Sequence, residues 1–163
     1  MSGSILRSSR NAVLDTNLVL LLLVAQVDRS LLTRYKRVQM FTDRDIPLLN
    51  QLLGSFQRTL TTPQVLTEIS NLLWQAPPHA QRRLKAVFAQ YIGATPEIYV
   101  RSDELVKRDT FFELGVTDCS LEDASLQHTI ITMDFRLAGK ILSMGRHALN
   151  FNHARAGYLL PNG

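Results

Sequence analysis

The chain is poor in the residues that form covalent cross-links and zinc sites. It has a single cysteine, Cys119, among 163 residues, which excludes an intramolecular disulfide and a zinc site built from several cysteines. Its histidines are scattered, and no two of them have the spacing of zinc ligands. A chain with one thiol is most simply a protein of a reducing compartment, so we expect it in the cytoplasm.

Long apolar runs are also missing. The longest covers only residues 18–25, whereas a helix that spans a membrane needs about 20 apolar residues. A run of this length would suit a signal peptide, but Asp15-Thr16-Asn17 interrupts the apolar stretch before it and no small-x-small cleavage site follows. We therefore expect neither a membrane partner nor secretion.

The chain lacks repeats and low-complexity segments, and its length suits one domain. We expect a loose arm at 1–10 and a single domain over 11–163. Apolar, β-branched runs predict strands at 11–14, 58–62, 129–133 and 148–152, with an extended stub at 98–100. Helical periodicity and end signals predict helices at 18–25, 28–36, 43–56, 64–74, 79–91, 103–114, 117–127 and 135–144. Alternating strands and helices predict an α/β fold with three α/β/α layers and a central parallel sheet of four to five strands.

Two aspartates follow predicted strands directly. Asp15 comes after the strand at 11–14, and Asp134 comes after the strand at 129–133. Each is well placed to be the N-cap of the next helix. Each also lies at the carboxyl end of a parallel strand, where ligands of such sheets bind.

Glu68 lies within the apolar stripe of its predicted helix. It is three residues after Val65 and four before Leu72, so it faces the same side as these residues. An unpaired carboxylate there would cost several kcal/mol. An ion pair with an arginine such as Arg58 would compensate the charge, and so would a metal ion; Asn71, one turn further on, could add a polar contact.

Asp118 lies in the first turn of the helix predicted at 117–127. Thr117 is a suitable N-cap, and an aspartate in the first turn suits the helix dipole. We assign Glu122 and Asp123, further along this helix, to its solvent-exposed face.

Together these positions give four acids at or near one edge of the predicted sheet. Carboxylates close together repel one another, and hard divalent cations with oxygen ligands relieve that repulsion. We therefore predict that Asp15, Glu68, Asp118 and Asp134 form an Mg²⁺ or Mn²⁺ site, whose natural chemistry is phosphoryl hydrolysis.

The four acids and their neighbours resemble the motifs of the PIN-domain nucleases, which are compact α/β/α proteins. The matching segments occur in the family's order between residues 11 and about 152. In chain order they are Val13-Leu14-Asp15-Thr16-Asn17, Thr62-Pro63-Gln64-Val65-Leu66-Thr67-Glu68-Ile69-Ser70-Asn71, Gly115-Val116-Thr117-Asp118 and Thr132-Met133-Asp134-Phe135-Arg136-Leu137.

The resemblance implies an endoribonuclease with one or two Mg²⁺ or Mn²⁺ ions, whose catalytic and metal-binding residues would be the four acids. RNA is the implied partner, homodimers are common in the family, and some members are toxins paired with a protein antitoxin. The helices over 28–56 are an addition to what the smallest toxin-type members carry. Supporting or substrate-binding roles would fall to Thr16, Asn17, Asn71, Thr132 and Arg136.

The formal net charge of +4 mildly favours a polyanionic partner. If the four acids are held around metal, the remaining surface is distinctly more basic. Candidates for an RNA track are the basic residues of the predicted helices at 28–36 and 79–91, namely Arg34, Lys36, Arg37, Arg82, Arg83 and Lys85. Charge runs on helices are also typical of plain solvated faces.

Two other readings stay open from the sequence. One is a PIN-like module that binds RNA or protein without cutting it. The other is a haloacid-dehalogenase-like phosphatase, although that class has Asp-x-Asp where this chain has Asp15-Thr16-Asn17. A P-loop NTPase is excluded because the chain has no Gly-x-x-x-x-Gly-Lys-Ser/Thr segment.

Overall fold

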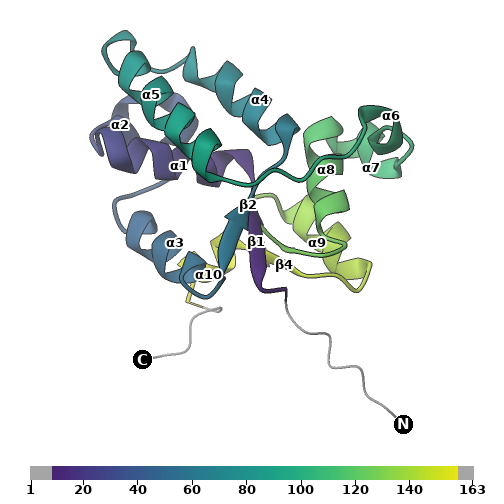
Figure 1. Ribbon diagram of the computed structural model, residues 1–163. Coiled ribbons are helices and arrows are strands. Elements are labelled where there is room, and N and C mark those ends of the chain that lie inside the picture. The colour runs from purple at the N-terminus through teal and green to yellow at the C-terminus, as the bar shows by residue number, and fades with distance from the viewer. Residues whose placement is uncertain (1–8, 158–163) are drawn as a thin grey trace.

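The computed structural model describes residues 9–157 (Figure 1), so most of the arm expected at 1–10 lies outside the described residues. Four strands form one sheet: β1 (Asn11–Leu14), β2 (Arg58–Leu60), β3 (Thr129–Thr132) and β4 (Ala148–Asn150). Their order is β2-β1-β3-β4 and every pairing is parallel. The predicted α/β fold with a parallel four-stranded sheet is confirmed.

The register of the sheet brings the carboxyl ends of its strands to one edge. Val13 of β1 is aligned with Leu60 on one side and with Ile130 on the other, and Thr132 of β3 is aligned with Asn150 of β4. Every residue of β3 is buried, which is typical of a central parallel strand covered on both faces. Residues that follow β1 and β3 in the chain are therefore neighbours in space.

Helices surround this sheet. Their bounds are α1 (Thr16–Val27), α2 (Leu31–Arg34), η1 (Lys36–Val38), α3 (Asp45–Leu53), α4 (Pro63–Leu73), α5 (Pro78–Ala94), α6 (Ser102–Leu105), α7 (Asp109–Leu114), α8 (Val116–Ala124), α9 (Phe135–Ser143) and α10 (Phe151–Arg155). Helices α3 and α10 lie along one face and α8 and α9 along the other, while α1, α4 and α5 pack together beyond the carboxyl ends of the strands (Figure 1). Within residues 9–157, no helix has the length and apolar character needed to cross a membrane.

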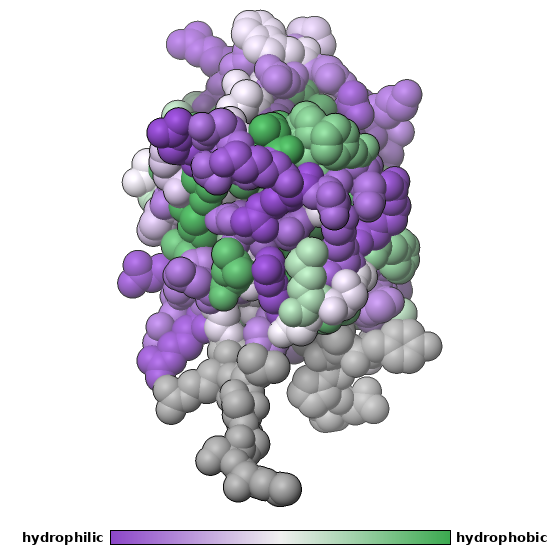
Figure 2. Space-filling model, turned by 90° about the vertical axis from the view of Figure 1, so that its right-hand side faces the viewer, coloured by the Kyte–Doolittle hydropathy of each residue, from purple (hydrophilic) through white to green (hydrophobic). Residues whose placement is uncertain are grey.

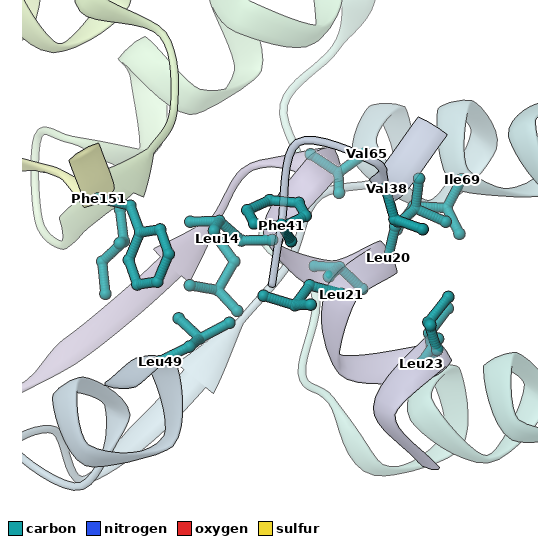
Figure 3. Close-up of a cluster of buried hydrophobic side chains, with 14 of the residues drawn as sticks. Leu14, Leu20, Leu21, Leu23, Val38, Phe41, Leu49, Val65, Ile69 and Phe151 are labelled. Atoms are coloured by element: carbon teal, nitrogen blue, oxygen red, sulfur yellow. The ribbon is translucent and has the colours of Figure 1, made fainter. Parts of the chain in front are cut away.

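The core is continuous from the sheet into the helices beyond it. Helix α1 is buried almost all round, as its apolar run predicts. In Figure 3 its leucines lie between Leu14, Leu49 and Phe151 on the sheet side and Val65 and Ile69 of α4 on the other. This packing fixes α1 and α4 relative to β1, and so fixes the acids that these elements carry.

Two predicted helices are each broken in two by a tertiary contact. The expected helix at 28–36 becomes α2 and η1 because Tyr35, buried and extended at the junction, donates its hydroxyl hydrogen bond to the Leu72 carbonyl at 2.6 Å. The expected helix at 103–114 becomes α6 and α7 because the chain leaves the helix before Arg108, whose guanidinium contacts Glu122 and Asp123 of α8.

Other boundaries differ at the ends of elements. The strand expected at 148–152 ends at Asn150, whose side-chain oxygen accepts a hydrogen bond from the Asn152 N–H and caps α10 instead. The stub expected at 98–100 is not a strand, and pairing there is a single bridge between Thr61 and Glu97.

Helix α8 begins one residue earlier than predicted. Its N-cap is Gly115, with φ of 89°, and not Thr117. A glycine adopts this positive φ without the strain that a Cβ atom would cause, so α7 can end and α8 begin at one residue. The chain thereby turns sharply just before Asp118.

Candidate functional site

A pocket of about 330 Å³ lies at the carboxyl edge of the sheet. The four acids predicted as a site all line it, and each comes from a different segment of the chain. Asp15 connects β1 to α1, Glu68 lies on α4, Asp118 lies on α8 and Asp134 connects β3 to α9. The pocket is completed by Thr16, Asn17, Thr117, Leu121, Thr132 and Met133.

Asp15 is the most firmly held of the acids, and it is only 7% exposed. Its Oδ1 accepts a hydrogen bond from the Leu18 N–H at 3.0 Å, as expected of the N-cap of α1. Its Oδ2 accepts bonds from the Thr132 hydroxyl and from the Met133 N–H, both at 2.6 Å. The N-cap prediction for Asp15 is therefore confirmed, and its carboxylate also lines the pocket.

Asp134 is held from one side only. Its Oδ1 accepts hydrogen bonds from the backbone N–H groups of Arg136 at 2.6 Å and Leu137 at 3.2 Å, so Asp134 is the N-cap of α9. Its backbone N–H donates to the Thr132 hydroxyl at 3.0 Å. The Thr132 hydroxyl therefore connects Asp134 to Asp15.

Glu68 and Asp118 are half-buried and have no such anchors. Within residues 9–157 neither carboxylate accepts a hydrogen bond or forms a salt bridge. The ion pair of Glu68 with Arg58 is absent: Arg58 is exposed and begins β2, at the far end of the strand from the pocket. The carboxylates of Glu68 and Asp118 are therefore unpaired within the described part of the chain, unlike those of Asp15 and Asp134.

A pair of hydroxyl groups that the sequence reasoning missed joins the helices of these two acids. Thr62 caps α4, with its Oγ1 accepting from the Val65 N–H at 3.3 Å, and its Oγ1 lies 2.8 Å from the Ser120 Oγ of α8. The Ser120 hydroxyl also donates to the Thr117 carbonyl at 2.6 Å. The Thr-Pro sequence signals the cap, but nothing in the sequence indicates its partner on α8.

The acids affect one another electrostatically. Burial raises the pKa of Asp118 to about 7, and the negative charges of Asp134, Asp15 and Glu68 contribute, in that order, while Arg136 opposes the shift. Burial also raises the pKa of Asp15, against the hydrogen bonds from Thr132 and the Met133 and Leu18 backbone. The pocket thus holds more negative charge than the surrounding protein neutralises.

The predicted supporting residues divide between two places. Thr16, Asn17 and Thr132 line the acidic pocket, whereas Asn71 is exposed and lines a neighbouring cleft. Arg136 is exposed and does not line the pocket. Its guanidinium donates to the Glu113 carbonyl at 3.2 Å, close enough to Asp118 to lower its pKa.

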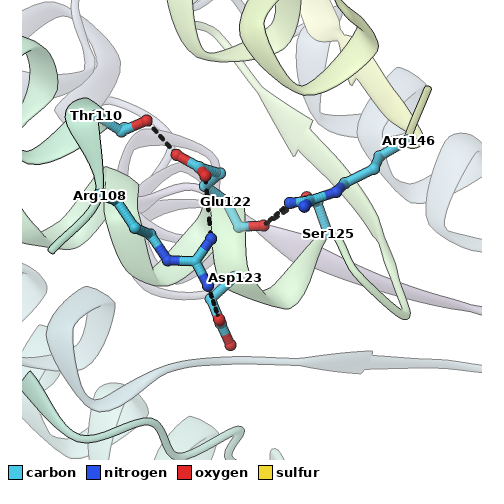
Figure 4. Close-up of polar contacts among 6 residues, drawn as sticks. All are labelled: Arg108, Thr110, Glu122, Asp123, Ser125 and Arg146. Atoms are coloured by element: carbon cyan, nitrogen blue, oxygen red, sulfur yellow. Dashed lines mark hydrogen bonds and ion pairs between the residues drawn. The ribbon is translucent and has the colours of Figure 1, made fainter. Parts of the chain in front are cut away.

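The assignment of Glu122 and Asp123 to a solvent-exposed face is wrong. Glu122 is 4% exposed, and its carboxylate accepts hydrogen bonds from Arg108 and the Thr110 hydroxyl. The Arg108 guanidinium also pairs with Asp123, and Arg146 donates to the Glu122 carbonyl (Figure 4). This network fixes α8, the helix that carries Asp118, against α7 and the loop before β4.

The composition of the pocket determines which cofactor it could hold. Within residues 9–157, no three acid, histidine or cysteine side chains are placed closely enough to ligate one ion together. The donor set itself is four carboxylates with neighbouring hydroxyl and amide oxygens, which suits a hard divalent cation and not zinc or copper.

The whole chain was compared with known protein families, curated proteins and solved structures. No protein-family model, curated protein or solved structure matches it.

Proposed function

We propose that this chain is a divalent-metal-dependent nuclease of the PIN type that hydrolyses RNA phosphodiester bonds. One observation carries the proposal: four carboxylates from four separate segments line one pocket, and none of them forms a salt bridge within residues 9–157. Such a concentration of unpaired carboxylates is costly to fold, and a bound divalent cation would offset that cost.

Mg²⁺ or Mn²⁺, held by Asp15, Glu68, Asp118 and Asp134, would lower the pKa of bound water and stabilise negative charge on a phosphoryl group. The protein residues contribute position and charge. Asp15 and Asp134 are fixed by backbone N–H groups, and Asp118, whose pKa is about 7, would lose its proton when a cation approaches.

The proposal of RNA as substrate draws support from the basic helices. The six basic residues predicted as an RNA track lie on α2, η1 and α5, and none of them forms a salt bridge among the described residues. Arg34, Arg37 and Arg83 donate hydrogen bonds to the Ser30 hydroxyl, the Gln75 side chain and the Val27 carbonyl, and the Lys85 ammonium lies over the Trp74 ring. Their charges remain available to phosphate groups.

The test is cleavage of a mixed RNA pool in the presence of Mg²⁺, Mn²⁺ or EDTA. We expect the wild type to cut with either metal and not with EDTA, and we expect Asp118→Asn to be slower by more than about 100-fold. The matched control is Asp43→Asn, which changes an exposed acid outside the pocket.

Equal cutting by the wild type and Asp118→Asn would show that the pocket is not the active site. RNA binding without cutting under any of these conditions would favour the non-catalytic binding module. Hydrolysis of small phosphate esters without cutting of RNA would favour the phosphatase.

A further inference from the structure

A second and larger cleft, of about 480 Å³, adjoins the acidic pocket. Helix α4 lines one side and the start of α8 the other, and the chain that leads from α5 to α6 crosses between them (Figure 1). Glu68 and Thr117 line both spaces. A bound linear polymer could therefore place one of its units in the pocket and the next unit in the cleft.

The chemistry of the cleft differs from that of the pocket. Its lining has no arginine or lysine, so it is not built for phosphate. It offers the apolar surfaces of Pro63 and Val116 together with the amide side chains of Gln64 and Asn71. Neither amide hydrogen-bonds another described residue, which leaves donors and acceptors free for a planar polar group.

An exposed aromatic ring lies at this cleft. Tyr99 is 76% exposed, yet its backbone is not a loose loop. The segment is bonded to the end of β2 by the Thr61 N–H to the Pro96 carbonyl at 3.0 Å and by the Ile98 N–H to the Thr61 carbonyl at 2.8 Å. Ile98 packs against the core, and in extended chain the next side chain points the opposite way, so Tyr99 faces outward from an anchored segment.

Phe112 is an exposed ring that lies away from both the acidic pocket and this cleft. Figure 2 shows the face that carries α6 to α9, where hydrophobic side chains form separate patches among hydrophilic ones. Phe112 of α7 is 84% exposed and lines none of the pockets described here. It is therefore a matched control for an aromatic ring without a cleft.

We propose that the cleft binds an unpaired base of the RNA strand, stacked on Tyr99 and hydrogen-bonded by Gln64 and Asn71, next to the phosphate held at the acidic pocket. This inference rests on the proposed function. Stacking on an aromatic ring is a common way to bind single strands and tolerates any base. A base inside a duplex is already stacked, so the cleft makes the protein select single-stranded RNA.

The test is binding of a short fluorescein-labelled single-stranded RNA, measured by fluorescence anisotropy. The proteins carry Asp118→Asn, so that the strand stays intact. We expect Tyr99→Ala to weaken binding roughly 5- to 100-fold, and we expect Tyr99→Phe and Phe112→Ala to bind like the parent. Affinity for a duplex of the same sequence should not change in any of these variants.

Abasic substitution along the RNA gives a second readout. We expect one position at which loss of the base weakens binding to the parent protein but not to Tyr99→Ala, as in a double-mutant cycle. Unchanged binding by Tyr99→Ala, or the same abasic profile for both proteins, would overturn the base-binding cleft.

The two proposals fail separately. Metal-dependent cleavage that needs Asp118 but does not change in Tyr99→Ala, together with unchanged RNA binding by that variant, would support the nuclease proposal and contradict the base-binding proposal. RNA binding that depends on Tyr99, without RNA cleavage by the wild type, would support the base-binding proposal and contradict the nuclease proposal.

Discussion

The repulsion within the acidic pocket predicts that Asp118→Asn stabilises the metal-free protein. The pKa of Asp118 is raised from an ordinary 3.8 to about 7, first by burial and then by the charges of the other acids. The folded protein therefore binds this proton more tightly than the unfolded chain does. Stability is lost as the pH rises from 3.8 toward 7, and the full penalty applies above 7.

The size of the penalty follows from the shift. Each pKa unit corresponds to about 1.4 kcal/mol, which gives about 4 kcal/mol for a fully buried group. Asp118 is half-buried, so solvent screening reduces the figure to roughly 2 kcal/mol. Asparagine has nearly the same shape without the charge, and it removes this penalty.

The assay is urea unfolding in EDTA over a series of pH values. Above pH 7 we expect Asp118→Asn to be more stable than the wild type by roughly 2 kcal/mol, which for a domain of this size raises the melting temperature by about 4–8 °C. The difference should shrink toward zero as the pH falls to 3.8. The matched control is Asp43→Asn, which changes an exposed acid outside the pocket. A difference that does not grow with pH, or a less stable asparagine variant, would refute the reasoning.

Three further predictions concern the same framework. Mg²⁺ or Mn²⁺ at about 100 times its dissociation constant should stabilise the wild type by about 2.7 kcal/mol and should stabilise the asparagine variant less, as measured by thermal unfolding with and without metal. Thr132→Val should cost about 1–3 kcal/mol in urea unfolding, because Asp15 loses a buried hydrogen bond, whereas Thr132→Ser should cost less. Arg108→Met should cost about 3–5 kcal/mol, because Glu122 is left buried and unpaired, whereas Arg101→Met, which breaks an exposed pair, should cost less than about 1 kcal/mol.

Each of these has an outcome that contradicts it. Equal stabilisation of both proteins by metal would place the ion outside the acidic pocket. A Thr132→Val protein as stable as the wild type would mean that water replaces the hydroxyl at Asp15. Similar losses in the Arg108 and Arg101 variants would mean that burial of Glu122 carries no special cost.

The fold could be predicted because its signals are local. The buried strand at 11–14, the strand at 129–133 and the apolar stripe of α4 each depend on a few neighbouring residues, and the parallel sheet follows from their alternation with helices. The carboxyl ends of the strands then bring Asp15 and Asp134 together. All four predicted acids line one pocket, but among the described residues no three acid, histidine or cysteine side chains lie closely enough to ligate one ion together, so the metal site remains a proposal.

What could not be predicted depends on partners far away in the chain. Glu122 follows Asp118 by one helical turn and looks like a solvated residue, but its burial depends on Arg108, which itself breaks a predicted helix. The contact of Thr62 with Ser120 joins residues 58 positions apart. Periodicity and capping signals do not describe such pairs.

Among the described residues, two of the four acids accept hydrogen bonds from the backbone and two do not, and this division connects the two proposals. Asp15 and Asp134 are fixed at strand ends by backbone N–H groups. Glu68 and Asp118 lie on α4 and α8, which are joined through their hydroxyl contact and form the walls of the base-binding cleft. Glu68 lines both the pocket and the cleft, so a change in its position on metal binding would alter both spaces. Metal and RNA should therefore bind with a coupling free energy that is the same in either order, and Tyr99→Ala should lower the affinity for RNA without changing the affinity for metal alone.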